Sequence, residues 1–96
     1  MNKRKDLGQH FLKSKTIARS IVDSAKITRN DIVLEIGTGH GILIPYICKN
    51  AKQVFSIEND HNLYLSAKSN FHDYSNLVLE YGDGFKSVHR FSIFVS

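Results

Sequence analysis

The stretch that decides the fold reads Leu34-Glu35-Ile36-Gly37-Thr38-Gly39-His40-Gly41. It closes an apolar segment, places glycine at every second position, and leads into a second apolar segment. This order predicts a buried strand, a tight turn and a helix. Glycine has no Cβ, so it adopts positive φ and lets a ligand lie against the backbone. A helix that begins just after the turn points free N–H groups and its positive dipole end at such a ligand.

The glycine spacing separates two kinds of nucleoside site. The dinucleotide-binding fingerprint requires glycine at its first, third and sixth positions, which here are Gly37, Gly39 and Ile42. The third glycine, Gly41, comes one residue early, and Glu35 stands two residues before the first. An acidic side chain there suits a cationic amino group better than a pyrophosphate. This glycine spacing, with an acidic residue before it, resembles the first motif of the S-adenosylmethionine-dependent methyltransferases. The alternative is a tight strand–helix turn without a ligand.

The rest of the chain alternates between helical and strand patterns. The expected elements are helices over Ser14–Ala25, Gly41–Asn50 and Asp60 to about Asn70, and strands over Ile32–Ile36, Val54–Ile57, Leu77–Tyr81 and Phe91–Val95. Such alternation predicts an α/β fold with a parallel sheet and right-handed crossovers. Ligands of these sheets bind beyond the carboxyl ends of the strands. The last strand would leave a long hydrophobic edge, so we expect half of a doubly wound domain, a fragment.

The composition excludes several classes of protein. The chain is 42% hydrophobic and 23% charged, which is typical of a globular protein. No apolar run approaches the roughly 20 residues that cross a bilayer, and no apolar region of a secretory signal follows the charged N-terminus. The single cysteine, Cys48, is expected to be a small buried hydrophobe, and the five histidines lack zinc-type spacing. We therefore expect a cytoplasmic protein with no metal and no membrane partner.

Two acidic residues follow the later strands. Glu58 ends the second strand, 21 residues after Gly37, and an acidic residue at about that distance accepts both ribose hydroxyls of a nucleotide. Asn59, beside it, is expected to flank the base. Asp83 follows the third strand, where a carboxylate accepts a hydrogen bond from an adenine amine. The alternatives are a solvated carboxylate at Glu58 and ordinary turn chemistry at Asp83.

Four segments together are similar to the rRNA adenine N6-dimethyltransferases. They are Gly8-Gln9-His10-Phe11-Leu12, the glycine stretch quoted above, Ile57-Glu58-Asn59-Asp60 and Gly82-Asp83-Gly84. The resemblance runs from Asp6 to Val95 and is to the KsgA type, with the Erm resistance methylases as relatives. It implies S-adenosylmethionine as cofactor, and small-subunit rRNA or the immature small ribosomal subunit as partner. The implied reaction is dimethylation of N6 in two adjacent adenosines near the 3′ end.

The resemblance also implies roles for single residues. Gln9, with His10 and the backbone near Phe11, would close over the methionine end of the cofactor. The amino group of the cofactor would lie near Glu35, and the cofactor would approach along Gly37, Gly39 and Gly41. The ribose of the cofactor would bind Glu58, and its adenine would lie beside Asn59 and Asp83. The family's catalytic Asn-(Leu/Ile)-Pro-(Tyr/Phe) motif does not occur in the 96 residues. We therefore expect residues 1–96 to be a partial Rossmann-like domain, the cofactor-binding half, inactive alone and without the C-terminal domain.

Three other functions remain open at this stage. An Erm-type enzyme would methylate large-subunit rRNA, a non-catalytic assembly factor would only bind rRNA, and a third possibility is a small-molecule methyltransferase. The net charge of +4 favours a polyanionic partner modestly. The basic residues at positions 3–5, with Lys13 and Lys15, either touch rRNA phosphates or belong to a solvated tail.

Overall fold

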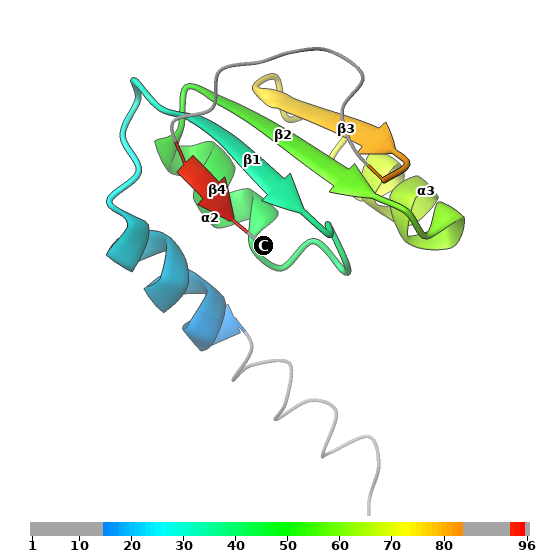
Figure 1. Cartoon of the computed structure of the whole chain (residues 1–96), viewed down its shortest axis with the longest axis horizontal. Coiled ribbons are helices and arrows are strands. Elements are labelled where there is room, and N and C mark those ends of the chain that lie inside the picture. The colour runs from blue at the N-terminus through cyan, green and yellow to red at the C-terminus, as the bar shows by residue number, and fades with distance from the viewer. Residues whose placement is uncertain (1–14, 84–92, 96) are drawn as a thin grey trace, which may run out of the picture.

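The strands form one parallel sheet. The computed structural model describes residues 15–83 and 93–95 (Figure 1). Its strands are β1 (Ile32–Ile36), β2 (Gln53–Glu58), β3 (Leu77–Tyr81) and β4 (Ile93–Val95), in the order β3-β2-β1-β4. All three neighbouring pairs are parallel, with Val33 opposite both Val54 and Ile93. The order reverses direction between β1 and β4, and such a switch point is where doubly wound sheets bind ligands.

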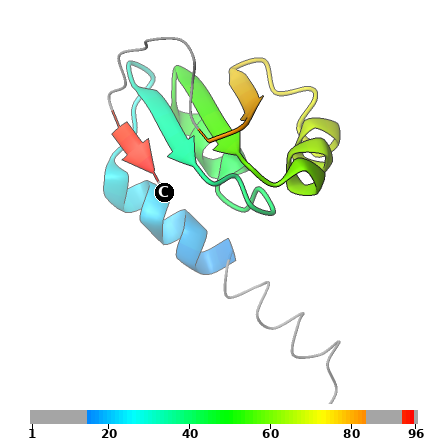
Figure 2. The ribbon, with the colours of Figure 1, turned by 45° about the vertical axis from the view of Figure 1, so that its right-hand side comes forward.

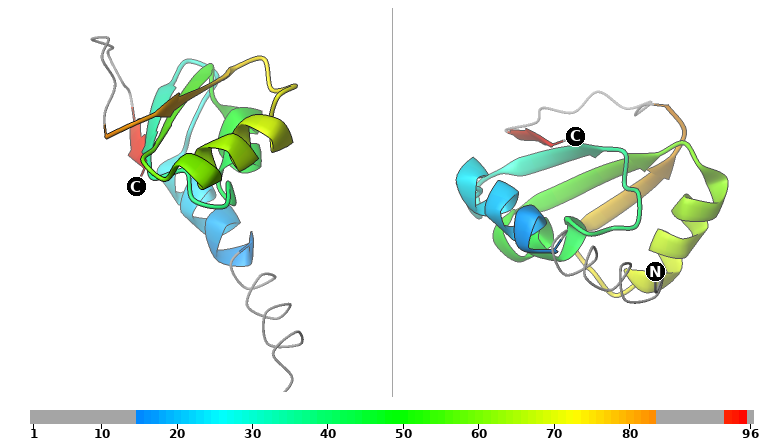
Figure 3. Two further views of the ribbon diagram at one scale, coloured as in Figure 1. Left: turned by 90° about the vertical axis from the view of Figure 1, so that its right-hand side faces the viewer. Right: turned by 90° about the horizontal axis from the view of Figure 1, so that it is seen from below.

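The helices cover one face of this sheet, as the view from below shows (Figure 3). They are the helical residues 15–25, α2 (Ile44–Asn50) and α3 (His61–Asn70). The first lies toward the β4 side and α3 toward β3 (Figures 1 and 2). The core between helices and sheet consists of Val22, Val33, Ile44, Ile47, Cys48, Ala51 and Val54. In residues 15–83 and 93–95, none of the helices has the length and apolar character that crossing a membrane requires.

The opposite face of the sheet is less covered. Side chains alternate between the two faces of a strand, and Val33 faces the core, so Ile36 faces away from it. Its side chain is 50% exposed at the end of β1, and Val78 of β3 is 40% exposed. The core of the described residues thus lies on the helical side of the sheet, while Ile36 and Val78 stay partly exposed on the other side.

Most predicted elements are confirmed. The bounds of β1 and β3 are as predicted, and β2 is one residue longer at each end. The expected start of α2 at Gly41 is wrong, because residues 41–43 continue the turn and the helix begins at Ile44. Pro45 lies in the first turn of α2, where its missing N–H costs no hydrogen bond. Of the expected strand over Phe91–Val95, the described part is β4.

The start of α3 follows the prediction closely. Asp60 has an extended backbone, and its side chain accepts a hydrogen bond from the N–H of Leu63 at 3.0 Å. This bond satisfies one of the N–H groups that a helix start leaves unpaired. Along this segment Ala67 is buried, while Leu63 and Phe71 are half-buried.

The ring of Phe71 packs directly against Gly41. A Cβ placed on Gly41 would lie 2.4 Å from Cε2 of Phe71, and the φ of Gly41 is +78°. Any side chain at this position would therefore collide with the ring and also strain the backbone. The structure gives Gly41 a packing role, whereas the sequence resemblance assigned it to the approach of a cofactor.

We expect Gly41→Ala to lower the free energy of unfolding by about 2–5 kcal/mol. A left-handed backbone costs an L-residue about 1–2 kcal/mol, and overpacking costs about 1–3 kcal/mol. Urea denaturation followed by circular dichroism measures the change. Gly39→Ala is the matched control, because its φ is +58° but no atom lies within 4 Å of the added Cβ. Equal losses in the two variants would contradict the packing role.

Candidate functional site

The glycine turn, residues 37–41, leaves the carboxyl end of β1 and is fastened to the end of β2. The N–H groups of Gly37 and Thr38 both donate to the carbonyl of Ile57, at 2.8 and 3.1 Å. Gly37 and Gly39 have φ values of +86° and +58°, and a Cβ on either would meet no atom within 4 Å. The backbone of the turn therefore faces open space, which is what a ligand lying against it requires.

The carboxylate of Glu58 joins this turn to the start of α3. Its Oε1 accepts the N–H of Gly39 at 2.7 Å, and its Oε2 accepts the N–H of Asp60 at 2.9 Å. The side chain is only 6% exposed, so it is not the solvated carboxylate that the sequence left as an alternative. Each carboxylate oxygen has two lone pairs, and after these bonds each still has one with which to accept a hydroxyl.

A small pocket opens at the same edge of the sheet. Its volume is about 110 Å³, and it is lined by Ile36, Gly37, Ile57, Asn59, Gly82 and Asp83. The N–H of Gly82 donates to the carbonyl of Glu58 at 2.9 Å, and Asn59 Nδ2 donates weakly to Asp83 Oδ1 at 3.5 Å. Three strand ends thus bring together Gly37, Asn59 and Asp83. Pockets for whole ligands have volumes of about 300–1,000 Å³, so this one fits one ring system.

Glu35 belongs to a buried network beside the turn. Its side chain is 1% exposed, and its Oε1 accepts the hydroxyl of Ser56 at 2.6 Å. The hydroxyl oxygens of Ser56 and Thr38 are also 2.6 Å apart. Since the Ser56 proton points at Glu35, Thr38 is the donor in this second bond. Sequence reasoning missed Ser56, although a serine inside the apolar strand Val54–Ile57 was an available signal.

Burial raises the pKa of two groups here, the Glu35 carboxyl in this network and the Cys48 thiol. It raises the pKa of the Glu35 carboxyl from 4.5 to about 7; the Ser56 hydrogen bond opposes the rise and the negative charge of Glu58 adds to it. Both forms of Glu35 are therefore populated near neutral pH. Burial also raises the pKa of the Cys48 thiol to about 12, with a further contribution from Glu35. Cys48 is thus a neutral buried thiol, as expected.

The comparison with known proteins decides the family. Residues 1–88 match the family model of the ribosomal RNA adenine dimethylases. The chain belongs to this family. It is 41% identical over 86 residues to the probable ribosomal RNA small subunit methyltransferase A of Methanococcus aeolicus, an alignment that covers 90% of this chain and 32% of that protein.

Solved structures agree with this assignment. A dimethyladenosine transferase from Plasmodium falciparum superposes with a TM-score of 0.72 and 35% identity, over 82% of this chain and 30% of that one. The 23S rRNA methyltransferase ErmE superposes with a TM-score of 0.63 and 28% identity, over 67% of this chain and 26% of that one. The fold is thus the Rossmann-like α/β fold of the S-adenosylmethionine-dependent methyltransferases, and the chain spans about a third of the length of the relatives it matches.

Three residues of the predicted site, Gln9, His10 and Phe11, lie outside the described residues. Their placement over the methionine end of a cofactor stays a prediction. The same holds for the basic residues at positions 3–5 and for Lys13. Within the part of the chain that the structure describes, no group of three or more His, Cys, Asp or Glu side chains is arranged to hold a metal ion.

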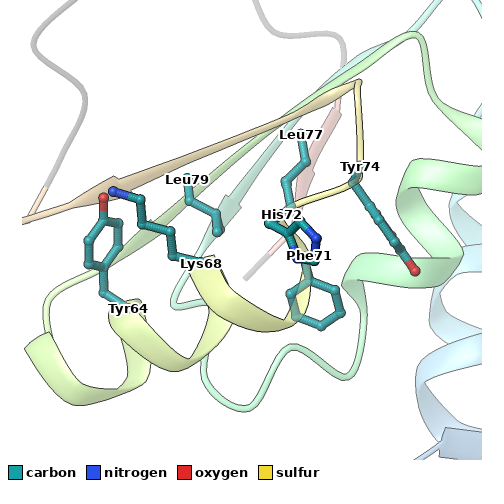
Figure 4. A pocket seen from close by; sticks show the side chains of 7 residues that line it. All are labelled: Tyr64, Lys68, Phe71, His72, Tyr74, Leu77 and Leu79. Carbon is teal, nitrogen blue, oxygen red and sulfur yellow. The ribbon is translucent and has the colours of Figure 1, made fainter.

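A larger hollow lies between α3 and β3 (Figure 4). Its volume is about 250 Å³, and it is lined by Tyr64, Lys68, Phe71, His72, Tyr74, Leu77 and Leu79. Leu77 and Leu79 lie in the first three residues of β3, so the hollow is away from the carboxyl ends at which such sheets bind ligands. Phe71, Tyr74 and both leucines also pack against the core. We therefore assign the candidate site to the strand ends and not to this hollow.

The raised pKa of Glu35 predicts a pH dependence of stability. The folded chain holds more protons than the unfolded chain between pH 4.5 and about 7. The free energy of unfolding should therefore be highest below this window, fall as the pH rises through it, and level off above it. Glu35→Gln should remove the fall, because it cannot ionise but still accepts the Ser56 hydroxyl. Urea denaturation of both proteins across the window measures this, and parallel pH profiles would contradict it.

Proposed function

We propose that the protein transfers methyl groups from S-adenosylmethionine to N6 of adenine in small-subunit rRNA. In this proposal residues 1–96 are the cofactor-binding half of the methyltransferase domain. The observation that most supports this proposal is the hydrogen bond from the Gly39 N–H to the Glu58 carboxylate, at the carboxyl edge of the sheet. The chain in which it occurs is a member of the rRNA adenine dimethylase family. Dimethylation of two adjacent adenosines near the 3′ end is the finer part of the proposal.

The chemistry of this edge suits S-adenosylmethionine. The open lone pairs of Glu58 accept the two ribose hydroxyls, and Asp83, with Asn59 beside it, accepts the exocyclic amine of the adenine. The open backbone at Gly37 and Gly39 lets the nucleoside approach. The cofactor carries positive charge on its sulfur, which is bonded to the ribose, so this charge is favoured near the carboxylate of Glu58. A pyrophosphate would be repelled by the same carboxylate.

Glu35 has an indirect part in the proposed site. Because its carboxyl is buried and bonded to Ser56, it acts on the turn through Thr38. A cationic amino group nearby would favour its ionised form. Gln9, His10 and Phe11 complete the proposed site over the methionine end.

The proposed reaction needs orientation more than acid–base chemistry. When bound, the cofactor supplies a methyl group on a sulfonium centre that leaves as a neutral thioether, so no covalent enzyme intermediate is needed. Glu58 and Asp83 would hold the nucleoside end in place, which fixes the direction of the methyl group relative to the incoming amine. Identity to a small-subunit methyltransferase A is 41%, against 28% to ErmE, and this favours the small ribosomal subunit as substrate.

Glu58→Ala should weaken the binding of S-adenosylmethionine by about 1–3 kcal/mol, because it leaves the ribose hydroxyls without their partner. Isothermal titration calorimetry measures the dissociation constant, and circular dichroism shows whether the variant is folded. Glu80→Ala is the matched control, since Glu80 is a half-buried carboxylate on the neighbouring strand β3. An unchanged dissociation constant for folded Glu58→Ala would exclude the ribose contact.

We expect residues 1–96 alone to transfer no methyl group, because they contain no Asn-x-Pro-aromatic motif to hold the target amine. A chain extended beyond Ser96 to include that motif should methylate immature small ribosomal subunits, and should lose activity when its asparagine is replaced. Transfer from labelled cofactor is the measurement. Transfer to large subunits instead would show an Erm-type enzyme, and no transfer to either subunit would show an assembly factor.

A further inference from the structure

Two hollows lie next to each other on the helical side of the molecule. One, of about 340 Å³, lies beside the glycine turn, and the other, of about 320 Å³, lies farther along α2. They share Pro45 and Tyr46 among their lining residues, so they lie next to each other. Both are lined by side chains from the helical residues 15–25 and from α2, and these two helices lie side by side (Figure 3). We call the surface lined by Lys15, Arg19, His40, Pro45, Tyr46 and Lys49 the basic groove.

The charges of the basic groove are mostly positive. Lys15, Arg19 and Lys49 are exposed, and Asp23 is the acidic residue among the side chains that line it. Lys15 and Arg19 are four residues apart on one helix, so they lie one turn apart on the same face. Lys49 reaches the groove from α2, the other helix. A polyanion lying in the groove would therefore meet cations from both helices.

Four of the eight acidic residues in 15–83 lie together at a different edge. Glu35, Glu58, Asp60 and Asp83 lie at or beside the carboxyl ends of β1, β2 and β3. The two surfaces meet at the glycine turn, because His40 lines the groove while its neighbour in the chain bonds Glu58. The molecule thus offers an acidic surface to a cationic cofactor and a basic surface to an anionic partner, side by side.

The floor of the groove favours RNA over an acidic peptide. Pro45 and the half-buried ring of Tyr46 lie where the two hollows meet. An aromatic ring between cations is the arrangement that binds single strands, since bases stack on the ring and phosphates pair with the charges. A peptide carboxylate would use the cations but would leave the ring without a stacking partner.

We propose that the basic groove holds an unpaired stretch of the RNA substrate. Phosphates contact Lys15, Arg19 and Lys49, and one base stacks on Tyr46. The inference rests on the proposed function in taking RNA as the substrate, but it concerns a surface outside the cofactor site. Because the groove begins at the glycine turn, a strand lying in it passes close to the site where the methyl group would be transferred.

The test measures binding of a fluorescein-labelled oligoadenylate by anisotropy over a range of salt concentrations. Arg19→Glu combined with Lys49→Glu should weaken binding by about tenfold or more, and should reduce the slope of log affinity against log salt by about 1.4, the value for two lost contacts to a single strand. Lys52→Glu combined with Lys68→Glu makes the same change in net charge at exposed positions away from the groove, and should weaken binding by less than about threefold.

Tyr46→Leu gives an independent readout. It should weaken binding by about tenfold with no change in the salt slope, because stacking on an aromatic ring is not electrostatic. Circular dichroism shows whether each variant is folded. Equal losses in the two charge-reversed proteins would overturn the proposal, since the RNA would then respond only to net charge.

Calorimetry with S-adenosylmethionine on the same proteins separates this inference from the proposed function. The groove variants should keep the cofactor affinity of the original chain. If the original chain binds the cofactor but not the oligoadenylate, the groove proposal fails and the cofactor site stands. If it binds the oligoadenylate through the groove but not the cofactor, the proposed function fails and the groove stands.

Discussion

The hydrogen bonds accepted by the Glu58 carboxylate hold the functional edge of the molecule together. One oxygen accepts the N–H of Gly39 in the turn after β1, and the other accepts the N–H of Asp60 at the start of α3. Asp60 in turn caps α3 through the N–H of Leu63. A buried carboxylate is costly unless its lone pairs are satisfied, and here two backbone donors satisfy it. One side chain thereby positions two loops, and each of its oxygens keeps one lone pair free of these two bonds.

The glycine turn needs this support because its own residues supply little packing. A turn whose backbone must stay open to a ligand cannot carry large side chains, so hydrogen bonds take the place of apolar contacts. Glu58 holds Gly39, the Ile57 carbonyl holds the first two residues of the turn, and Ser56 links Thr38 to Glu35. Phe71 covers the far end of the turn against Gly41. The turn is thus held from β2 and from the end of α3.

Charge is distributed in a way that fits the proposed reaction. Methyl transfer to RNA brings a cationic donor and a polyanionic acceptor to one point, and each would be repelled by a surface suited to the other. The acidic strand ends and the basic groove between residues 15–25 and α2 keep these surfaces separate up to the glycine turn, where they meet.

The sequence by itself determined the elements and their order. Apolar periodicity and glycine are local signals, so they predicted β1 and β3 to the residue, a helix that starts near Asp60, and the parallel sheet, whose strand ends collect Gly37, Glu58 and Asp83. Only the tertiary structure decided the contacts between elements: Ser56 is 21 residues from Glu35 and 18 from Thr38, and the ring on Gly41 comes from the end of α3. The basic groove likewise exists only where two helices pack side by side. Such contacts join residues that are far apart in the sequence, and they depend on how the elements pack. No local pattern in the chain encodes that packing.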